Sequence, residues 1–282
     1  MDSNPLAASG DIASCLSEYV DDKQHLFFAS VCRCWKNAWG QHRPRVTAAV
    51  TKTTSVSQLS CIMESGLGRT TAMCKATAKL GRLDLLKWER SHGYPWNEGT
   101  CSSAAEGGHL NVLQWARSYG CPWSESTCSD AARGGHMSIL LWARSNGCPW
   151  DADTCSSAAE GGHLDVLQWA WSNRCPWDEW TCSNAAEEGH LDLLQWAVSQ
   201  GCPWGRETCY SAAGGGHLAV LQWARARGCP WDTGICFSAA GGGHLAVLQW
   251  ARCNGCPWDE ETCSNAAGGG YIDILQWARS NG

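Results

Sequence analysis

A three-residue sequence recurs along this chain at a constant interval. Tyr94-Pro95-Trp96 is followed by Cys121-Pro122-Trp123, and the Pro-Trp pair then returns every 27 residues up to Pro257. A second tryptophan column and a cysteine column keep the same step. They are Trp88, Trp115, Trp142, Trp169, Trp196, Trp223, Trp250 and Trp277, and Cys74, Cys101, Cys128, Cys155, Cys182, Cys209, Cys236 and Cys263. A fixed period of this length indicates an array of copied units in which each unit packs mainly on its neighbours.

The residue types within one unit predict two short helices. Asp178 or Thr181 can cap a first helix that is rich in Ala, and Gly189 can end it. Residues 190–198 place Leu and Trp at helical spacing, which predicts a second helix that is mostly buried between neighbours. Pro203 then prevents this helix from continuing. Each unit is therefore expected to run helix, tight turn, helix and loop.

Two segments of the unit resemble the consensus of ankyrin repeats. The run from Gly162-His163-Leu164 to Ala170 is similar to the Gly-His-Leu-Glu-Val-Val run of that family, and Thr154 to Ala159 is similar to its Thr-Pro-Leu-His-x-Ala-Ala. The resemblance implies an all-α, ankyrin-like helical solenoid of eight units over residues 73–282, preceded by a degenerate first repeat at 47–72. The unit of 27 residues is shorter than the ankyrin period of about 33, so we expect short loops and no β-hairpin.

The tryptophan columns are expected to be structural. A buried Trp removes about 200 Å² from water, which corresponds to roughly 5 kcal/mol as an upper estimate. Recurrence directly after each helix stop favours packing into the next unit. An exposed aromatic groove for Pro-rich or carbohydrate ligands is the alternative.

The cysteines are expected to be small buried thiols. Bridges between equivalent cysteines of neighbouring units are disfavoured, because stacked helices lie about 8–10 Å apart and a disulfide needs Cα atoms within about 7 Å. A repeated metal-binding or redox protein that uses the Cys columns is an alternative function. The metal site of each unit would be formed by residues such as Cys121, Cys128 and His136. A metal site is disfavoured because the recurring spacing of these residues lacks the Cys-x-x-Cys knuckle that brings two sulfurs together on one turn. The His column is expected to form local hydrogen bonds at the turn between the helices.

Other function classes lack their sequence signals. No Ser/His/Asp set, phosphate loop or paired carboxylate stands out from the repeats, so we expect neither an enzyme nor a cofactor. The chain has 21 basic and 27 acidic residues, a formal charge of −6, which disfavours nucleic acid as the main partner. No apolar run is long enough to cross a membrane, so we expect an intracellular protein of the cytoplasm or nucleus.

Columns that change between units are the expected binding positions for a protein partner. The loop after each Pro-Trp and the start of the first helix are mostly acidic, and three large aromatic residues break the repeat in successive units. Acidic loops beside aromatics suit a basic or amphipathic peptide. The alternative is that Tyr210 and Phe237 fill gaps against the neighbouring unit and that Trp180 is a tolerated surface residue. The candidate partner-binding residues are Trp180, Tyr210, Phe237, Glu125, Asp153, Asp178, Glu179, Arg206 and Glu207.

The segment 1–46 has a character of its own. Its apolar series resembles an F-box, whose pattern runs Leu-Ser-Tyr-Leu, then Leu, then Val-Cys-x-x-Trp. The matching positions are Leu16, Tyr19, Leu26, Val31 and Trp35. The resemblance implies binding of a Skp-type adaptor and a role as substrate receptor of a cullin-RING ubiquitin ligase. One alternative is that this segment is a helical cap on the first repeat. The protein would then be a plain scaffold without a ubiquitin role.

Overall fold

The computed structural model describes residues 69–281, and every regular element in that range is an α-helix. The helices form pairs, one pair in each 27-residue unit. The first helices of the units are α5 (Thr71–Lys79), α7 (Glu98–Glu106), α9 (Glu125–Arg133), α11 (Ala152–Glu160), α13 (Glu179–Glu187), α15 (Arg206–Gly214), α17 (Thr233–Gly241) and α19 (Glu260–Gly269). The second helices are α6 (Leu83–Ser91), α8 (Leu110–Ser118), α10 (Met137–Ser145), α12 (Leu164–Ser172), α14 (Leu191–Ser199), α16 (Leu218–Ala226), α18 (Leu245–Cys253) and α20 (Ile272–Ser280).

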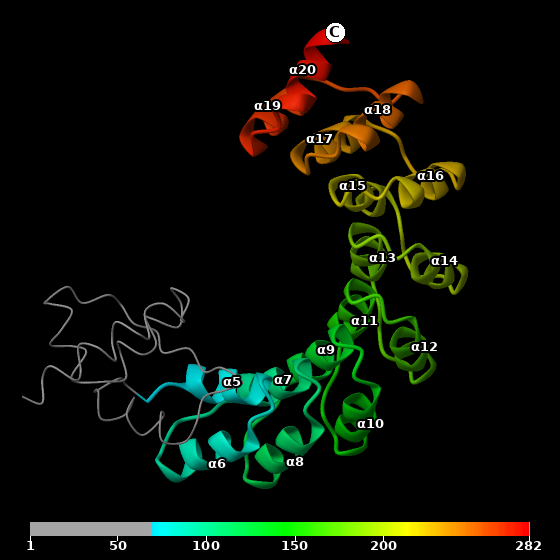
Figure 1. Ribbon diagram of the computed structural model, residues 1–282. Coiled ribbons are helices and arrows are strands. Elements are labelled where there is room, and N and C mark those ends of the chain that lie inside the picture. Colours follow the sequence, from blue (N-terminus) through cyan, green and yellow to red (C-terminus); the bar gives the residue numbers. More distant parts are fainter. Residues whose placement is uncertain (1–68, 282) are drawn as a thin grey trace, which may run out of the picture.

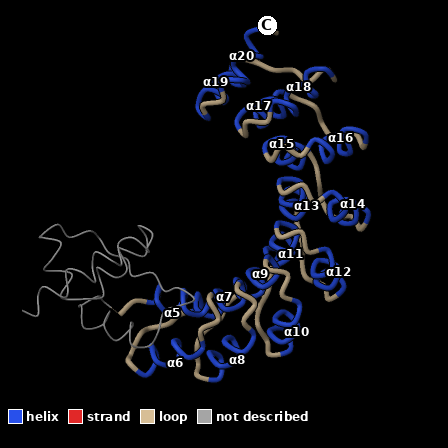
Figure 2. Tube along the Cα trace, in the orientation of Figure 1, coloured by secondary structure: helices blue, strands red, loops and turns tan. Residues whose placement is uncertain are grey.

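The helix pairs stack into a solenoid that follows an arc (Figures 1 and 2). The odd-numbered helices form the concave inner row and pack against each other from unit to unit. The even-numbered helices form the outer row, and each packs on the odd-numbered helix of its own unit. Inner helices are rich in small residues such as Ala, Cys, Ser and Gly, which let neighbouring inner helices pack closely, whereas the outer helices carry the larger Leu and Trp. The predicted all-α solenoid of helix pairs is confirmed for the described residues, and no β-hairpin occurs among them.

Residue types at the ends of the helices explain where they begin and stop. The Asp178 carboxylate caps α13 by accepting a hydrogen bond from the backbone N–H of Trp180 at 3.1 Å. Thr181, the other candidate cap, instead lies buried inside α13. Gly189 has a φ of 77°, which residues with a Cβ rarely adopt, and it turns the chain from α13 into α14.

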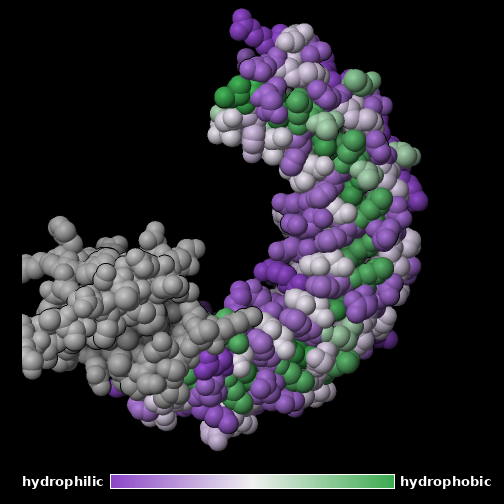
Figure 3. All heavy atoms as spheres, viewed as in Figure 1, coloured by the Kyte–Doolittle hydropathy of each residue, from purple (hydrophilic) through white to green (hydrophobic). Residues whose placement is uncertain are grey.

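The core is a continuous strip between the two rows. In the unit formed by α13 and α14, Cys182, Ala185 and Ala186 of the inner helix and Leu193 and Leu194 of the outer helix are all buried. Equivalent small and branched residues repeat this arrangement in the other units. The inner edge of the arc is largely hydrophilic at mid-length, and hydrophobic residues lie farther out (Figure 3).

Both tryptophan columns lie at the rim of this core. Each Trp of a Pro-Trp pair packs against the Trp on the outer helix of the same unit, with ring centroids 5.5 to 6.1 Å apart. The expected packing role is therefore confirmed. The rings are not fully buried, because the Pro-Trp loops run along the surface and leave every ring of the two columns half-buried. Each Trp thus contributes less than the roughly 5 kcal/mol of complete burial.

The cysteines pair in a way that the sequence analysis did not consider. The inner-helix cysteine of a unit lies against the cysteine before the Pro-Trp that follows, 20 residues later, as in Cys101 and Cys121. Cys209 and Cys229 hold these two positions in their unit and form a disulfide, with Cα atoms 6.8 Å apart. The expectation of thiols alone is therefore wrong for this unit. The pairing joins two columns of one unit, not equivalent cysteines of neighbours.

Glu89 is a buried carboxylate in the first described unit. It occupies the position on α6 that Ala116 and Ala143 hold on α8 and α10, and it is fully buried. The hydroxyl of Thr77 donates a hydrogen bond to Glu89 Oε1 at 2.7 Å, while Oε2 has no partner. Burial raises the pKa of Glu89 to about 7, against the opposing effect of hydrogen bonds from Thr77 and Cys74.

We expect Glu89 to make this unit less stable as pH rises. A raised carboxyl pKa means that the folded state holds the proton more tightly than the unfolded state. The free energy of unfolding therefore falls between about pH 4.5 and pH 7, by at most about 3 kcal/mol. Glu89→Gln keeps the shape without the charge, so its stability should change less over this range. Amide hydrogen exchange of α5 and α6 at pH 5 and pH 8 measures the difference, and equal pH dependence in both proteins would contradict the assignment.

Candidate partner-binding surfaces

The acidic positions singled out from the sequence lie where inner helices begin. Asp178 is the cap of α13, and Glu125, Asp153, Glu179 and Glu207 stand exposed in the first turns of α9, α11, α13 and α15. Negative side chains stabilise a helix N-terminus, because the backbone N–H groups there carry partial positive charge. These residues consequently serve local structure and also place negative charge along one edge of the inner row.

The three aromatic residues have different surroundings. Trp180, in the first turn of α13, keeps 61% of its surface exposed, and Phe237 on α17 keeps 39%. Tyr210 on α15 is half-buried. Tyr210 and Phe237 each follow an inner-helix cysteine in successive units, whereas Trp180 precedes one. None of the ring contacts within residues 69–281 joins two of these three side chains. A single aromatic patch stays a prediction.

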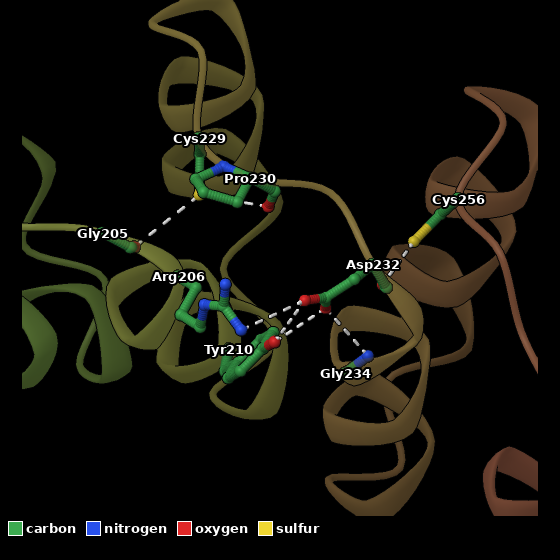
Figure 4. Close-up of polar contacts among 8 residues, drawn as sticks. All are labelled: Gly205, Arg206, Tyr210, Cys229, Pro230, Asp232, Gly234 and Cys256. Carbon is green, nitrogen blue, oxygen red and sulfur yellow. Dashed lines mark hydrogen bonds and ion pairs between the residues drawn. The ribbon is translucent and has the colours of Figure 1, made fainter.

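Tyr210 links its unit to the next one (Figure 4). Its hydroxyl donates to the carboxylate of Asp232, 2.7 Å from either oxygen, and Arg206 Nη1 lies 4.0 Å from Asp232 Oδ2. Asp232 also accepts from the backbone N–H of Gly234 at 3.1 Å and so caps α17. Burial and the Asp232 carboxylate raise the pKa of Tyr210 to about 12. These contacts give Tyr210 a structural role between units.

A small acidic pocket opens in the inner row between α11 and α13. Its volume is 240 Å³, and it is lined by Glu160, Asn184, Glu187 and Glu188. Glu188 is not among the binding residues predicted from the sequence. Its signal is a break in a column that is otherwise glycine in every described unit after the first, where Leu80 stands. The glycines are Gly107, Gly134, Gly161, Gly215, Gly242 and Gly269. A Cβ at Gly161 or Gly215 would lie 2.2 or 2.0 Å from a backbone carbonyl oxygen of the preceding inner helix, so a side chain at this position requires wider local spacing.

Charge around the pocket is only partly balanced. Glu160 pairs with Arg133 of the preceding unit at 3.1 Å, as Glu106 pairs with Lys79 at 2.7 Å. Both ion pairs are well exposed to solvent, so each contributes little to stability. No ion pair within residues 69–281 involves Glu187 or Glu188. The pocket is therefore suited to a positively charged group.

Arginines cover most of the Pro-Trp rings, and two units break the pattern. Guanidinium groups lie 4.0 to 4.6 Å from ring centroids in the pairs Arg90–Trp96, Arg117–Trp123, Arg144–Trp150, Arg225–Trp231 and Arg252–Trp258. Trp171 and Val198 replace the arginine on α12 and α14. Trp171 instead contacts Trp177 and Trp196, at 5.9 Å from each ring, and is 38% exposed. In the middle of the outer surface an added aromatic ring thus takes the place of the arginine.

The residues of the metal-site alternative do not converge. Cys121 lies against Cys101, and Cys128 lies against Cys148. His136 Nε2 is 3.1 Å from the backbone carbonyl oxygen of Glu106, which agrees with a hydrogen-bonding role at the turn. Within the described range, no group of three or more His, Cys, Asp or Glu residues could hold a metal ion.

Two further sequence predictions concern the membrane and the N-terminal segment. None of the helices between residues 69 and 281 is long and apolar enough to cross a membrane. The predicted adaptor-binding residues Leu16, Tyr19, Leu26, Val31 and Trp35, and nearly all of the degenerate repeat, lie outside the described residues.

Comparison with known proteins gives a distant structural likeness. The chain matches no family model and no curated protein. It is similar to the crystal structure of the human ASB11 ankyrin repeat domain at 14% sequence identity, with a TM-score of 0.44. The matched region covers 56% of this chain and 84% of that domain. The solenoid architecture described above rests on this chain's own helix pairs and not on that likeness.

Proposed function

We propose that the protein is a non-enzymatic scaffold that binds a basic or amphipathic protein segment along its inner row. The observation that carries this proposal is that constant and changing columns of the repeat lie in different parts of the structure. Constant Cys, Ala, Leu and Trp positions build the core and its rim, while changing positions stay exposed along the inner helices. A curved row of changing residues is the surface that solenoids use for binding.

The chemistry of the exposed positions favours a positively charged partner. Trp180 and Phe237 offer partly exposed aromatic surface, which often dominates binding energy when a partner covers it. Glu125, Asp153 and Glu179 along the same row would steer a basic segment during approach. The pocket at Glu187 and Glu188 would hold one lysine or arginine side chain of that segment.

The test compares two double variants in pull-downs from cell extract, followed by affinity measurement on the recovered partner. Trp180→Ala with Phe237→Ala removes exposed aromatics of the inner row. Tyr119→Ala with Leu141→Ala removes exposed apolar residues that belong to the outer helices and their ends. We expect the first pair to weaken binding by roughly 30-fold, the effect of one hot spot of about 2 kcal/mol, and the second pair to leave it unchanged. Equal binding by both would contradict the assignment of the inner row.

We further propose that the scaffold is a substrate receptor of a cullin-RING ubiquitin ligase. The support is the F-box-like series in residues 1–46, and the proposal is independent of which partner the solenoid holds. The test is binding of a purified Skp-type adaptor to the full chain and to a variant carrying Leu26→Asp and Trp35→Asp. Binding by the first and not by the second supports the role. Absence of binding by the unaltered chain would leave a scaffold without a ubiquitin role.

A further inference from the structure

The paired cysteines form a series of equivalent sites along the solenoid. Five units hold two thiols in contact, one from the inner helix and one from the loop that leads into the next unit. The pairs are Cys101 with Cys121, Cys128 with Cys148, Cys155 with Cys175, Cys182 with Cys202, and Cys236 with Cys256. All ten side chains are buried, with at most 4% of their surface exposed.

The sixth such unit shows what these pairs can become. Cys209 and Cys229 occupy the same two positions and are joined by a disulfide. Their Cα atoms are 6.8 Å apart, within the distance of about 7 Å that a bridge can span. The bridged unit keeps the two nine-residue helices of its neighbours, so the bridge and the thiol pair fit the same backbone.

The loop thiols are held in place by backbone acceptors. Cys121, Cys148 and Cys256 donate to the carbonyl oxygens of Asn97, Ser124 and Asp232, at 3.4, 3.5 and 3.2 Å. Each acceptor is the residue before the inner helix of the same unit, and the Asp232 contact is visible in Figure 4. The two sulfurs of a unit are thereby positioned against each other without any rearrangement of the helices.

We propose that each of these five dithiols is a site of thiol–disulfide exchange with a small disulfide such as oxidised glutathione. One cysteine, as the thiolate, attacks the reagent and forms a mixed disulfide, releasing one molecule of reduced glutathione. The second cysteine then attacks the mixed disulfide and releases another. Two electrons and two protons pass from the dithiol to the reagent, and one protein disulfide forms. The bridge ties an inner helix to the loop that begins the next unit, which restrains the arc.

Two other cysteines of the described range serve as internal controls. Cys74 is buried, but its partner position is Tyr94, so it can form no bridge within its unit. Cys263 is exposed, and no bridge joins it to another cysteine within residues 69–281. Exchange at Cys263 should therefore stop at the mixed disulfide with glutathione. Cys253 is also exposed, but it is no control because it stands three residues before Cys256.

The test is peptide mapping of the full chain by mass spectrometry without reduction, after incubation with oxidised glutathione. Urea is added below the unfolding transition so that buried units open repeatedly. We expect five additional bridges, each between cysteines 20 residues apart, and glutathione on Cys263. Bridges between different units would overturn the proposal. So would buried pairs that remain thiols, or carry glutathione, after the exposed cysteines have reacted completely.

One variant tests whether an individual bridge restrains the helix that it joins. Cys148→Ala leaves Cys128 without its partner and should remove one bridge while the other four still form. Oxidation should slow amide exchange in α9 of the unaltered protein at least several-fold, and should leave α9 of the variant unchanged. An equal effect of oxidation on α9 in both proteins would show that the restraint does not come from this bridge.

Discussion

Leu194→Ala is expected to lower the free energy of unfolding by about 2–5 kcal/mol. Leu194 lies on α14 in the middle of the array and is completely buried in the core strip. The substitution removes apolar contacts and leaves a cavity that the neighbouring helices fill only partly. Each unit packs only on its neighbours, so a weak central unit should also divide the array into two blocks that unfold separately. Urea unfolding followed by circular dichroism measures the loss.

The matched control is the same substitution at an exposed outer-row leucine. Leu141 on α10 keeps 49% of its surface exposed, and Leu141→Ala should change stability by no more than about 0.5 kcal/mol. Broadening of the urea transition into two steps in the Leu194 variant alone would identify the central unit as the link between the blocks. Equal losses in both variants would contradict the burial pattern and with it the two-row core.

Local features of the fold could be predicted from the sequence because they depend on residues close together in the chain. The period locates every unit, and Asp178, Gly189 and Pro203 mark helix ends by the hydrogen bonds and backbone angles they allow. The absence of a β-hairpin from the described residues follows from the short connection between units. These predictions need no knowledge of which surfaces meet.

Features that depend on contacts across a unit could not be predicted in the same way. The meeting of Cys101 with Cys121 requires that the outer helix return the chain beside the start of the inner helix, which the period alone does not specify. The half-burial of the tryptophans depends on where the Pro-Trp loop runs. The contact of Tyr210 with Asp232 depends on the spacing between units. Each follows from tertiary packing, which pattern analysis does not describe.

The candidate site likewise has features that the sequence predicted and features that it did not. Trp180 and the acidic residues in the first turns of the inner helices are exposed. This agrees with their place at positions that change between units. The pocket was not predicted, although Glu188 interrupts a column of glycines. Whether a side chain at this position opens a pocket depends on the distance between neighbouring inner helices, and that distance is set by the packing of the units. The glycine column of this solenoid marks where a Cβ would meet the preceding inner helix, and the pocket lies where Glu188 interrupts it.

Gly215→Ala tests how closely the inner helices approach, and we expect it to lower the free energy of unfolding by about 1–3 kcal/mol. A Cβ at Gly215 would lie 2.0 Å from the backbone carbonyl oxygen of Glu187, so α13 and α15 would have to separate. The backbone at Gly215 is right-handed, with φ −79°, so the cost comes from overpacking and not from backbone strain. Thermal and urea unfolding measure the change.

The adjacent glycine is the control for this substitution. A Cβ at Gly214 would meet only ordinary contacts, the nearest being Ser238 Cβ at 3.8 Å. Gly214→Ala should therefore stabilise α15 by about 0.5–1 kcal/mol, because Ala has less freedom to lose on folding. Opposite signs at two neighbouring positions would separate the steric effect from helix propensity. Stabilisation by both substitutions would mean that the inner helices tolerate wider spacing, and the pocket at Glu188 would then need another cause.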